Sequence, residues 1–220
     1  MNRYVSAKDF FANLSPEGRV YLLVRHGERR HITPQDPDSG AHVGLTDAGR
    51  RQAFDLGTMF PKEGDAVYFS SPVGRCVETA RRIGEGRASV GGPVAAPVQV
   101  LQPLGDFFVR DFEQYRAVLN ENFYPSICRW IEKGEHPAYC PLASRAEEMR
   151  QMMLEKGTAR FNVFTSHDAW IVPCLAHFCH FNFTPGVWMN FLTGLAIVVE
   201  PGALDRIVPI TGLNDGNLLF

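Results

Sequence analysis

Short apolar runs rich in β-branched and aromatic residues alternate along this chain with stretches of helical periodicity. Such runs predict buried strands, and helical segments between them predict crossover connections, so the alternation favours an α/β fold of packed layers. The predicted strands cover residues 19–24, 66–70, 97–101, 161–165, 195–200 and 206–210. A turn at residues 201–204 separates the last two strands, which predicts an antiparallel pair at an edge of the sheet.

Two helical patterns lie between the early strands, and a longer helical stretch follows the third. Thr46 is a predicted N-cap for a helix that runs to about residue 60, and residues 74–84 predict a second helix. Residues 107–156 are aromatic and charged, with helical patches around 111–130 and 144–155, and Pro125, Pro137 and Pro141 interrupt the stretch. We interpret residues 107–156 as a helical cap or insertion on a single domain that spans residues 1–220.

Composition limits the kinds of partner that the chain can have. A chain of 220 residues buries a substantial core without help from a metal or disulfides. Its formal net charge of −2 does not favour a nucleic-acid partner, and no apolar run is long enough to span a membrane. The five cysteines are irregularly spaced, which predicts reduced thiols. The first residues also have no apolar stretch of signal-peptide length, so we expect a cytoplasmic protein.

Polar side chains follow three of the predicted strands. Arg25 and His26 come directly after the first strand, Arg75 follows the second, and His167 and Asp168 follow the fourth. Taken singly, each has a structural interpretation as a packed histidine or a surface charge. Ligands of open α/β sheets bind outside the carboxyl ends of the strands, so the joint pattern predicts one pocket for all five side chains.

These residues belong to motifs that occur in a characteristic order. The motifs are Arg25-His26-Gly27, Leu45-Thr46-Asp47-Ala48-Gly49, Ser70-Ser71-Pro72 with Arg75, and His167. In this order they resemble the histidine phosphatase superfamily, which includes the phosphoglycerate mutases and the histidine acid phosphatases. The resemblance covers most of the chain except residues 107–156. It implies a three-layer α/β/α sandwich around a mostly parallel sheet.

The resemblance also implies a role for each polar side chain. His26 would be the nucleophile that forms a phosphohistidine, and neighbouring arginines would lower its pKa toward the neutral state. Arg25 and Arg75 would bind phosphate oxygens, since a guanidinium offers a planar pair of donors. His167, when protonated, would add another donor. The arginines supply the positive charge, so neither a metal nor another cofactor is expected.

The general acid is the role on which the two branches of the superfamily differ. The mutase-like branch takes a Glu between the second strand and the second histidine. The acid-phosphatase branch takes the Asp directly after that histidine and has an extra phosphate-binding Arg four residues after the first. Asp168 and Arg29 match the latter pattern, so we favour Asp168. Asp106, Asp111 and Glu28 are the alternative carboxylates.

Three weaker signals have plainer interpretations. His42, like Glu28, is a candidate for the rim of the pocket. The segment Trp188-Met189-Asn190-Phe191 is most simply core. A cluster of thiols and imidazoles near the end of the chain is better explained by buried thiols and a capping histidine than by zinc. Its members are Cys174, His177, Cys179 and His180.

The function expected from these residues is hydrolysis of a phosphomonoester through a phosphohistidine on His26, with a small phosphorylated metabolite as substrate. Within the same chemistry, the alternatives are a phosphotransferase of the phosphoglycerate mutase type and a phosphoprotein (phosphohistidine) phosphatase. A non-catalytic phosphate-binding protein is the alternative of another class. The sequence does not predict the oligomeric state.

Overall fold

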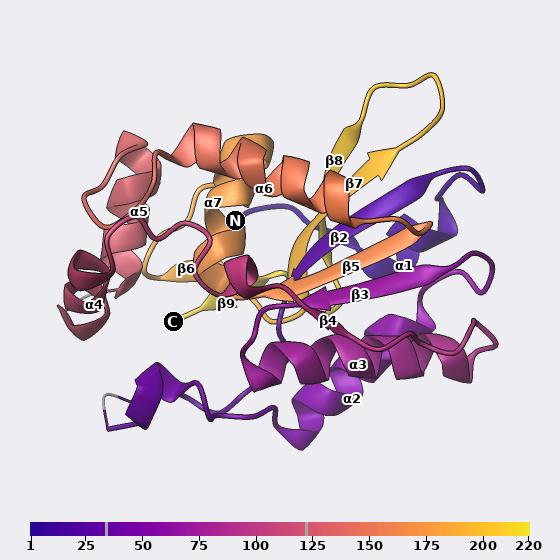
Figure 1. Ribbon diagram of the computed structural model, residues 1–220, viewed down its shortest axis with the longest axis horizontal. Coiled ribbons are helices and arrows are strands. Elements are labelled where there is room, and N and C mark those ends of the chain that lie inside the picture. The colour runs from indigo at the N-terminus through magenta and orange to yellow at the C-terminus, as the bar shows by residue number, and fades with distance from the viewer. Residues whose placement is uncertain (34, 122) are drawn as a thin grey trace.

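Strand β2 (Arg19–Arg25) lies at the centre of a seven-stranded sheet in the order β1-β8-β7-β2-β5-β3-β4 (Figure 1). The computed structural model describes residues 1–33, 35–121 and 123–220. β2, β5, β3 and β4 are parallel, whereas β7 runs antiparallel to both β2 and β8. The other strands of this sheet are β1 (Val5–Ser6), β3 (Ala66–Ser70), β4 (Gln99–Val100), β5 (Phe161–Ser166), β7 (Thr193–Val199) and β8 (Arg206–Thr211).

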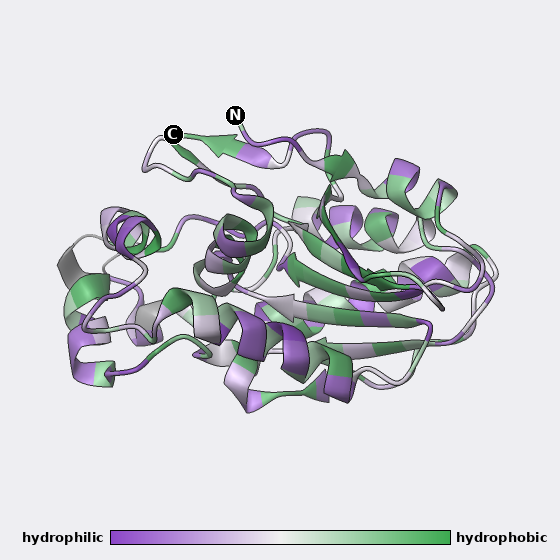
Figure 2. Cartoon of the chain, turned by 90° about the horizontal axis from the view of Figure 1, so that it is seen from above, coloured by the Kyte–Doolittle hydropathy of each residue, from purple (hydrophilic) through white to green (hydrophobic). Residues whose placement is uncertain are grey.

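Alternation along β2 divides the core into two halves. Tyr21 and Leu23 belong to the apolar cluster on one face of the sheet, and Val20, Leu22 and Val24 belong to the cluster on the other. Successive side chains of a strand point to opposite faces, so a strand covered on both sides is apolar throughout. The central strands are accordingly largely green in Figure 2.

Helices cover both faces, which confirms the predicted three-layer sandwich (Figure 1). On one side lie α1 (Ala7–Ala12), α2 (Asp47–Thr58) and α3 (Gly74–Ser89). On the other side lie α6 (Leu142–Lys156) and α7 (Asp168–Cys179). The Thr46 hydroxyl accepts a hydrogen bond from the Gly49 N–H at 2.9 Å, so Thr46 is the N-cap of α2 as predicted.

Two glycines allow α2 and α3 to approach closely. A Cβ on Gly57 would lie 2.0 Å from the carbonyl oxygen of Ile83, and one on Gly86 would lie 1.9 Å from that of Phe54. No side chain fits at such distances. The backbones of α2 and α3 are therefore in direct contact, and this contact fixes the position of the N-terminus of α3 relative to the sheet.

The predicted helical stretch divides into parts with different surroundings. α4 (Phe112–Glu121) and α5 (Phe123–Lys133) lie beyond the end of the sheet, whereas α6 runs along its face beside α7 (Figure 1). The expected patch over 111–130 is thus two helices, and Asn122 between them lies outside the described residues. Pro125 sits in the first turn of α5, where a missing N–H does no harm.

Some elements differ from the sequence prediction. β7 and β8 pair antiparallel as expected, but the expectation that they form an edge is wrong because β2 and β1 flank them. The expected strand over 97–101 is reduced to the two residues of β4. A second small sheet consists of β6 (Val187–Met189) and β9 (Asn217–Leu219), and two short 3-10 helices are η1 (Pro37–Gly40) and η2 (Gln102–Gly105). No helix within the described ranges is long and apolar enough to cross a membrane.

Candidate active site

Arg25 is the last residue of β2 and is almost completely buried, with 2% of its surface exposed. Its Nη1 donates to the carbonyl oxygen of Met189 at 2.5 Å, and its Nη2 lies 3.0 Å from Oδ2 of Asp168. Its Nε is buried without a partner among the described residues. A buried donor without an acceptor is costly, so this edge of the guanidinium is suited to an incoming anion.

His26 follows directly and is held in one tautomer. Its backbone N–H donates to the Ser166 carbonyl at 3.0 Å, and its Nδ1 lies 2.8 Å from the Gly27 carbonyl oxygen. A carbonyl oxygen only accepts, so Nδ1 carries the proton and Nε2 keeps a free lone pair. Burial lowers the pKa of His26 well below its usual value, and the charges of Arg25 and His167 lower it further. His26 is therefore a neutral imidazole with a free lone pair on Nε2.

Arg75 lies in the first turn of α3, and His167 directly follows β5. Nη1 of Arg75 donates to the Gly40 carbonyl oxygen at 2.9 Å, and its Nη2 lies 3.4 Å from Nδ1 of His167. Nε2 of His167 is 3.2 Å from the Ser71 hydroxyl, and the two imidazole centroids are 5.5 Å apart. Since the guanidinium only donates, Nδ1 of His167 accepts and its Nε2 donates to Ser71.

His167 is uncharged in the free site, whereas a protonated ring would be the better hydrogen-bond donor to phosphate. Burial lowers the pKa of His167 to about 3, and the adjacent Arg75 guanidinium contributes in the same direction. The ring is therefore neutral in the free site. A bound phosphate dianion would act in the opposite direction, because a nearby negative charge favours the protonated form.

Asp168 is the first residue of α7, and its carboxylate accepts two hydrogen bonds and forms one ion pair. Its Oδ1 accepts from the Ala169 N–H at 3.0 Å, and its Oδ2 accepts from the indole N–H of Trp188 at 2.9 Å as well as pairing with Arg25. Burial alone would raise its pKa, but the Arg25 charge and the Trp188 N–H outweigh burial and hold the pKa below its usual value. Asp168 is a carboxylate in the free site at neutral pH.

Arg29 adds a third guanidinium. Its Nη1 donates to the Arg30 carbonyl at 2.8 Å, and its Nε is buried without a partner among the described residues. Burial lowers its pKa to about 10, with a further contribution from Arg25, and this value still leaves it charged. Like Arg25 and Arg29, Arg75 has a buried Nε–H that finds no acceptor in the described chain. Three such donors beside two neutral imidazoles suit an oxyanion with several acceptor oxygens.

Comparison with known proteins agrees with this chemistry. The family model described as histidine phosphatase superfamily (branch 1) matches residues 21–199. The chain belongs to this superfamily. No curated protein matches the sequence.

Solved structures of the superfamily share the fold of the chain. A phosphoglycerate mutase from Bacillus anthracis is 15% identical with a TM-score of 0.52, covering 89% of this chain and 93% of that one. A mycobacterial glucosyl-3-phosphoglycerate phosphatase is 18% identical with a TM-score of 0.50, covering 86% of this chain and 97% of that one. At these identities the likeness extends to the fold alone.

The other carboxylates considered for the general acid lie away from the two imidazoles or are exposed. Glu28 accepts a hydrogen bond from the Thr46 hydroxyl at 2.9 Å, beside the start of α2. Asp111 accepts from the backbone N–H groups of Glu113 and Gln114 at the start of α4, and Asp106 is exposed after η2. His42 is largely exposed and lies 3.4 Å from Asp36 rather than against the imidazoles.

The thiols and imidazoles considered as zinc ligands do not converge on one point. The Cys174 thiol is buried and donates to the Trp170 carbonyl, and His177 lies 3.5 Å from Glu147. His180 is the C-cap of α7 at φ +54°. In the described part of the chain, no three His, Cys, Asp or Glu side chains gather as metal ligands would.

The residues that the sequence did not assign to the site come from its C-terminal part. Trp188 and Met189 are buried, as expected of core residues. In addition, the Trp188 indole N–H donates to Asp168, and the Met189 carbonyl accepts from Arg25. Phe191 is only partly buried, and its ring lies 4.3 Å from Cζ of Arg25. An apolar residue carries no sign in the sequence that it contacts a charged group, so these contacts could be identified only from the structure.

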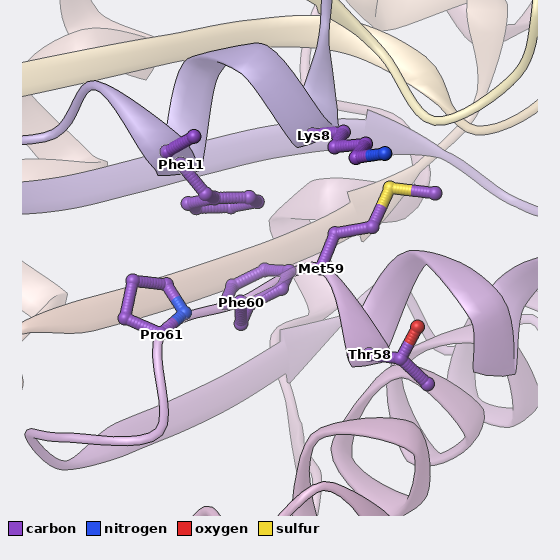
Figure 3. Close-up of a pocket in the computed structure, with 7 residues that line it drawn as sticks. Lys8, Phe11, Thr58, Met59, Phe60 and Pro61 are labelled. Atoms are coloured by element: carbon purple, nitrogen blue, oxygen red, sulfur yellow. The ribbon is translucent and has the colours of Figure 1, made fainter.

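A hollow in the surface lies away from these groups. It has a volume of about 580 Å³ and lies between α1 and the end of α2, where Phe11, Met59 and Phe60 line it (Figure 3). Lys8 is the charged side chain at its edge. The hollow contains neither histidine of the site and none of its arginines, so we do not assign it to phosphate chemistry.

Proposed function

We propose that this histidine phosphatase superfamily member is a metal-independent phosphomonoester hydrolase that forms a phosphohistidine on Nε2 of His26. The observation that carries the proposal is the neutral His26, with its free Nε2, beside three guanidiniums whose Nε–H donors await acceptors. A dianionic ester needs both: a nucleophile without charge, and fixed cations that neutralise the equatorial oxygens of the transition state.

In the first step, the lone pair of His26 Nε2 forms a bond to phosphorus while the bond from phosphorus to the ester oxygen breaks. Arg25, Arg29 and Arg75 hold the three equatorial oxygens, and the departing alkoxide takes a proton from Asp168. In the second step, water forms a bond to phosphorus and gives its proton to Asp168, while the bond from phosphorus to Nε2 breaks. The products are an alcohol and inorganic phosphate, and His26 is neutral again.

The proton on Asp168 has to arrive with the substrate, because the carboxylate is ionised in the free site. A bound phosphate dianion draws on the charge of Arg25 and lies next to Asp168, and both effects raise the pKa of the carboxyl group. A phosphate monoester has its second pKa near 6, so near that pH part of the substrate is a monoanion carrying one proton. Transfer of this proton to Asp168 prepares the acid that the first step uses.

Aromatic side chains adjoin the leaving-group side of this arrangement. Tyr124 of α5 packs edge-on against Trp188 with 4.9 Å between ring centroids, and Trp188 donates to Asp168. A partly buried tyrosine here suits a small organic leaving group that needs contact with a ring. This supports a small phosphorylated metabolite as the substrate class.

Hydrolysis of p-nitrophenyl phosphate in the presence of a chelator tests the proposal. We expect turnover by the wild type between about pH 5 and 8, and a loss of at least about 1,000-fold in His26→Ala, since the nucleophile is absent. His177→Ala, which removes a histidine outside the site, should retain wild-type turnover. Equal rates in wild type and His26→Ala, or no turnover at all, would overturn the proposal. Product analysis with phosphoglycerates separates hydrolysis from mutase activity.

A further inference from the structure

Phe191 lies in the turn between β6 and β7 and faces the end of β2. Its ring centroid is 4.3 Å from Cζ of Arg25 and 5.8 Å from the centroid of the His26 ring, which is tilted by 42° to it. One aromatic ring thus touches both the cation and the nucleophile of the proposed site. The ring itself takes no part in the bond-making and bond-breaking steps of hydrolysis.

The turn that carries Phe191 is held by hydrogen bonds on both sides. The Asn190 backbone N–H donates to the Gly216 carbonyl at 2.9 Å, and the Asn190 side-chain oxygen accepts from the Phe191 N–H at 2.8 Å. The Thr193 hydroxyl donates to the Phe191 carbonyl at 3.1 Å. The backbone at Phe191 is therefore fixed before any ligand arrives.

The next residue has a strained backbone. Leu192 adopts φ +49°, which is unusual for a residue with a bulky side chain, and its carbonyl accepts from the Gly212 N–H at 2.8 Å. Its side chain is 1% exposed and belongs to the apolar cluster under β2. Strain of this kind persists where the surroundings enforce it, and it is concentrated at functional sites. Here it reverses the chain so that Leu192 enters the core while Phe191 turns toward Arg25.

Contact with the Phe191 ring adds a third constraint on Arg25 beside its two polar contacts. The Met189 carbonyl and Asp168 hold the two terminal nitrogens of the guanidinium, and its Cζ lies over the Phe191 ring, 4.3 Å from the centroid. Asp168 already pairs with Arg25, and a second carboxylate in place of the ring would neutralise more of the charge that a phosphate needs. An aromatic ring holds the cation without cancelling it.

We propose that Phe191 is a positioning residue that holds the Arg25 guanidinium and the His26 ring in the orientation in which they receive a phosphoryl group. The proposal rests on the hydrolase function proposed above. It predicts that the ring itself matters, beyond the apolar volume that it fills.

Three substitutions separate the ring from its bulk. Phe191→Ala removes both, Phe191→Leu keeps apolar volume without a ring, and Phe191→Tyr keeps the ring. With p-nitrophenyl phosphate we expect kcat/KM to fall roughly 5- to 30-fold in the Ala and Leu variants and to stay within about threefold of wild type in Phe191→Tyr. Phe181→Ala is the matched control, since Phe181 is a partly buried ring that packs on Tyr4 away from the site.

Two further measurements exclude a purely structural role. Inhibition by orthovanadate should weaken in parallel with kcat/KM, and the acidic limb of the pH profile should move upward in Phe191→Ala because His26 becomes better hydrated. Wild-type behaviour of Phe191→Leu or Phe191→Ala would overturn the inference, as would a fall in melting temperature with an unchanged pH profile. If the wild type hydrolyses nothing, the hydrolase proposal is overturned, and orthovanadate binding measured by calorimetry in the same variants decides the role of Phe191.

Discussion

Acidification should destabilise this protein through two histidines of the site. His26 and His167 both have pKa values lowered by burial, the former well below its usual value and the latter to about 3. In the unfolded chain each titrates near its ordinary pKa of about 6.5. Below that pH the unfolded state takes up protons that the folded state does not, so stability is lost as the pH falls from about 6.5 toward the folded pKa values.

The magnitude follows from linkage. Between about pH 7 and about pH 5.5, one histidine that stays neutral in the fold reduces the free energy of unfolding by about 1.3 kcal/mol, and two reduce it by about 2.5 kcal/mol. Domains of this kind are commonly stable by about 5–15 kcal/mol, so the loss is a substantial fraction. His136, whose pKa burial also lowers, adds a loss of the same sign.

Urea unfolding followed by circular dichroism, in buffers free of phosphate, measures this loss at each pH. A variant with His26→Gln and His167→Gln should lose about 2.5 kcal/mol less than wild type over the same range, while it retains the contribution of His136. His31→Gln, at an exposed position, should keep the wild-type pH dependence. If wild type and the double variant lose the same free energy, the imidazoles are protonated in the folded state and the reasoning from burial is refuted.

Two further perturbations test the acid and the fold. Asp168→Asn should depress turnover by ~10²–10⁴ on an alkyl phosphate and much less on p-nitrophenyl phosphate, whose leaving group needs no proton. Steady-state rates on both esters check this, and the assignment is wrong if Asp106→Asn shows the pattern instead. Gly86→Ala should lower the melting temperature by about 4–8 °C, because a Cβ there meets the Phe54 carbonyl at 1.9 Å and we expect a cost of about 2 kcal/mol. Calorimetry measures this melting temperature against that of the control variant Gly74→Ala, where a Cβ meets nothing within 4 Å. Equal melting temperatures of the two variants would show that the helices can separate without cost.

The part of the site that the sequence predicts is the part made by polar residues at strand ends. Arg25, Arg75 and His167 come together because parallel strands bring their carboxyl ends to one edge, a rule that needs only the order of the strands. The same rule predicts that Arg25 and Asp168 lie close together. That Arg25 keeps Asp168 ionised could be inferred only from the distance between them in the structure.

The remainder could not be predicted because its signals are weak or absent. β1 has two residues, too few for a periodic pattern, and so the chain gave no reason to place a strand outside β8. Trp188 and Phe191 are apolar, and their contacts with Asp168 and Arg25 depend on the direction of β7, which local sequence does not encode. The same limit applies to α4 and α5, whose division lies within one continuous helical pattern.

The pairing of β2 has a consequence for how the protein is made. This strand leaves the ribosome well before its two neighbours, β5 (Phe161–Ser166) and β7 (Thr193–Val199). At about 5–20 residues per second, the interval before β5 has been synthesised is roughly 7–30 s, during which a strand with residues 20–24 all apolar has neither edge paired. Every polar motif of the site precedes residue 169, but a chain that stopped there would leave one edge of β2 open. We therefore expect newly made chains to depend on low temperature or a holding chaperone, because the second edge of the strand that leads to His26 is paired only when β7 has been made.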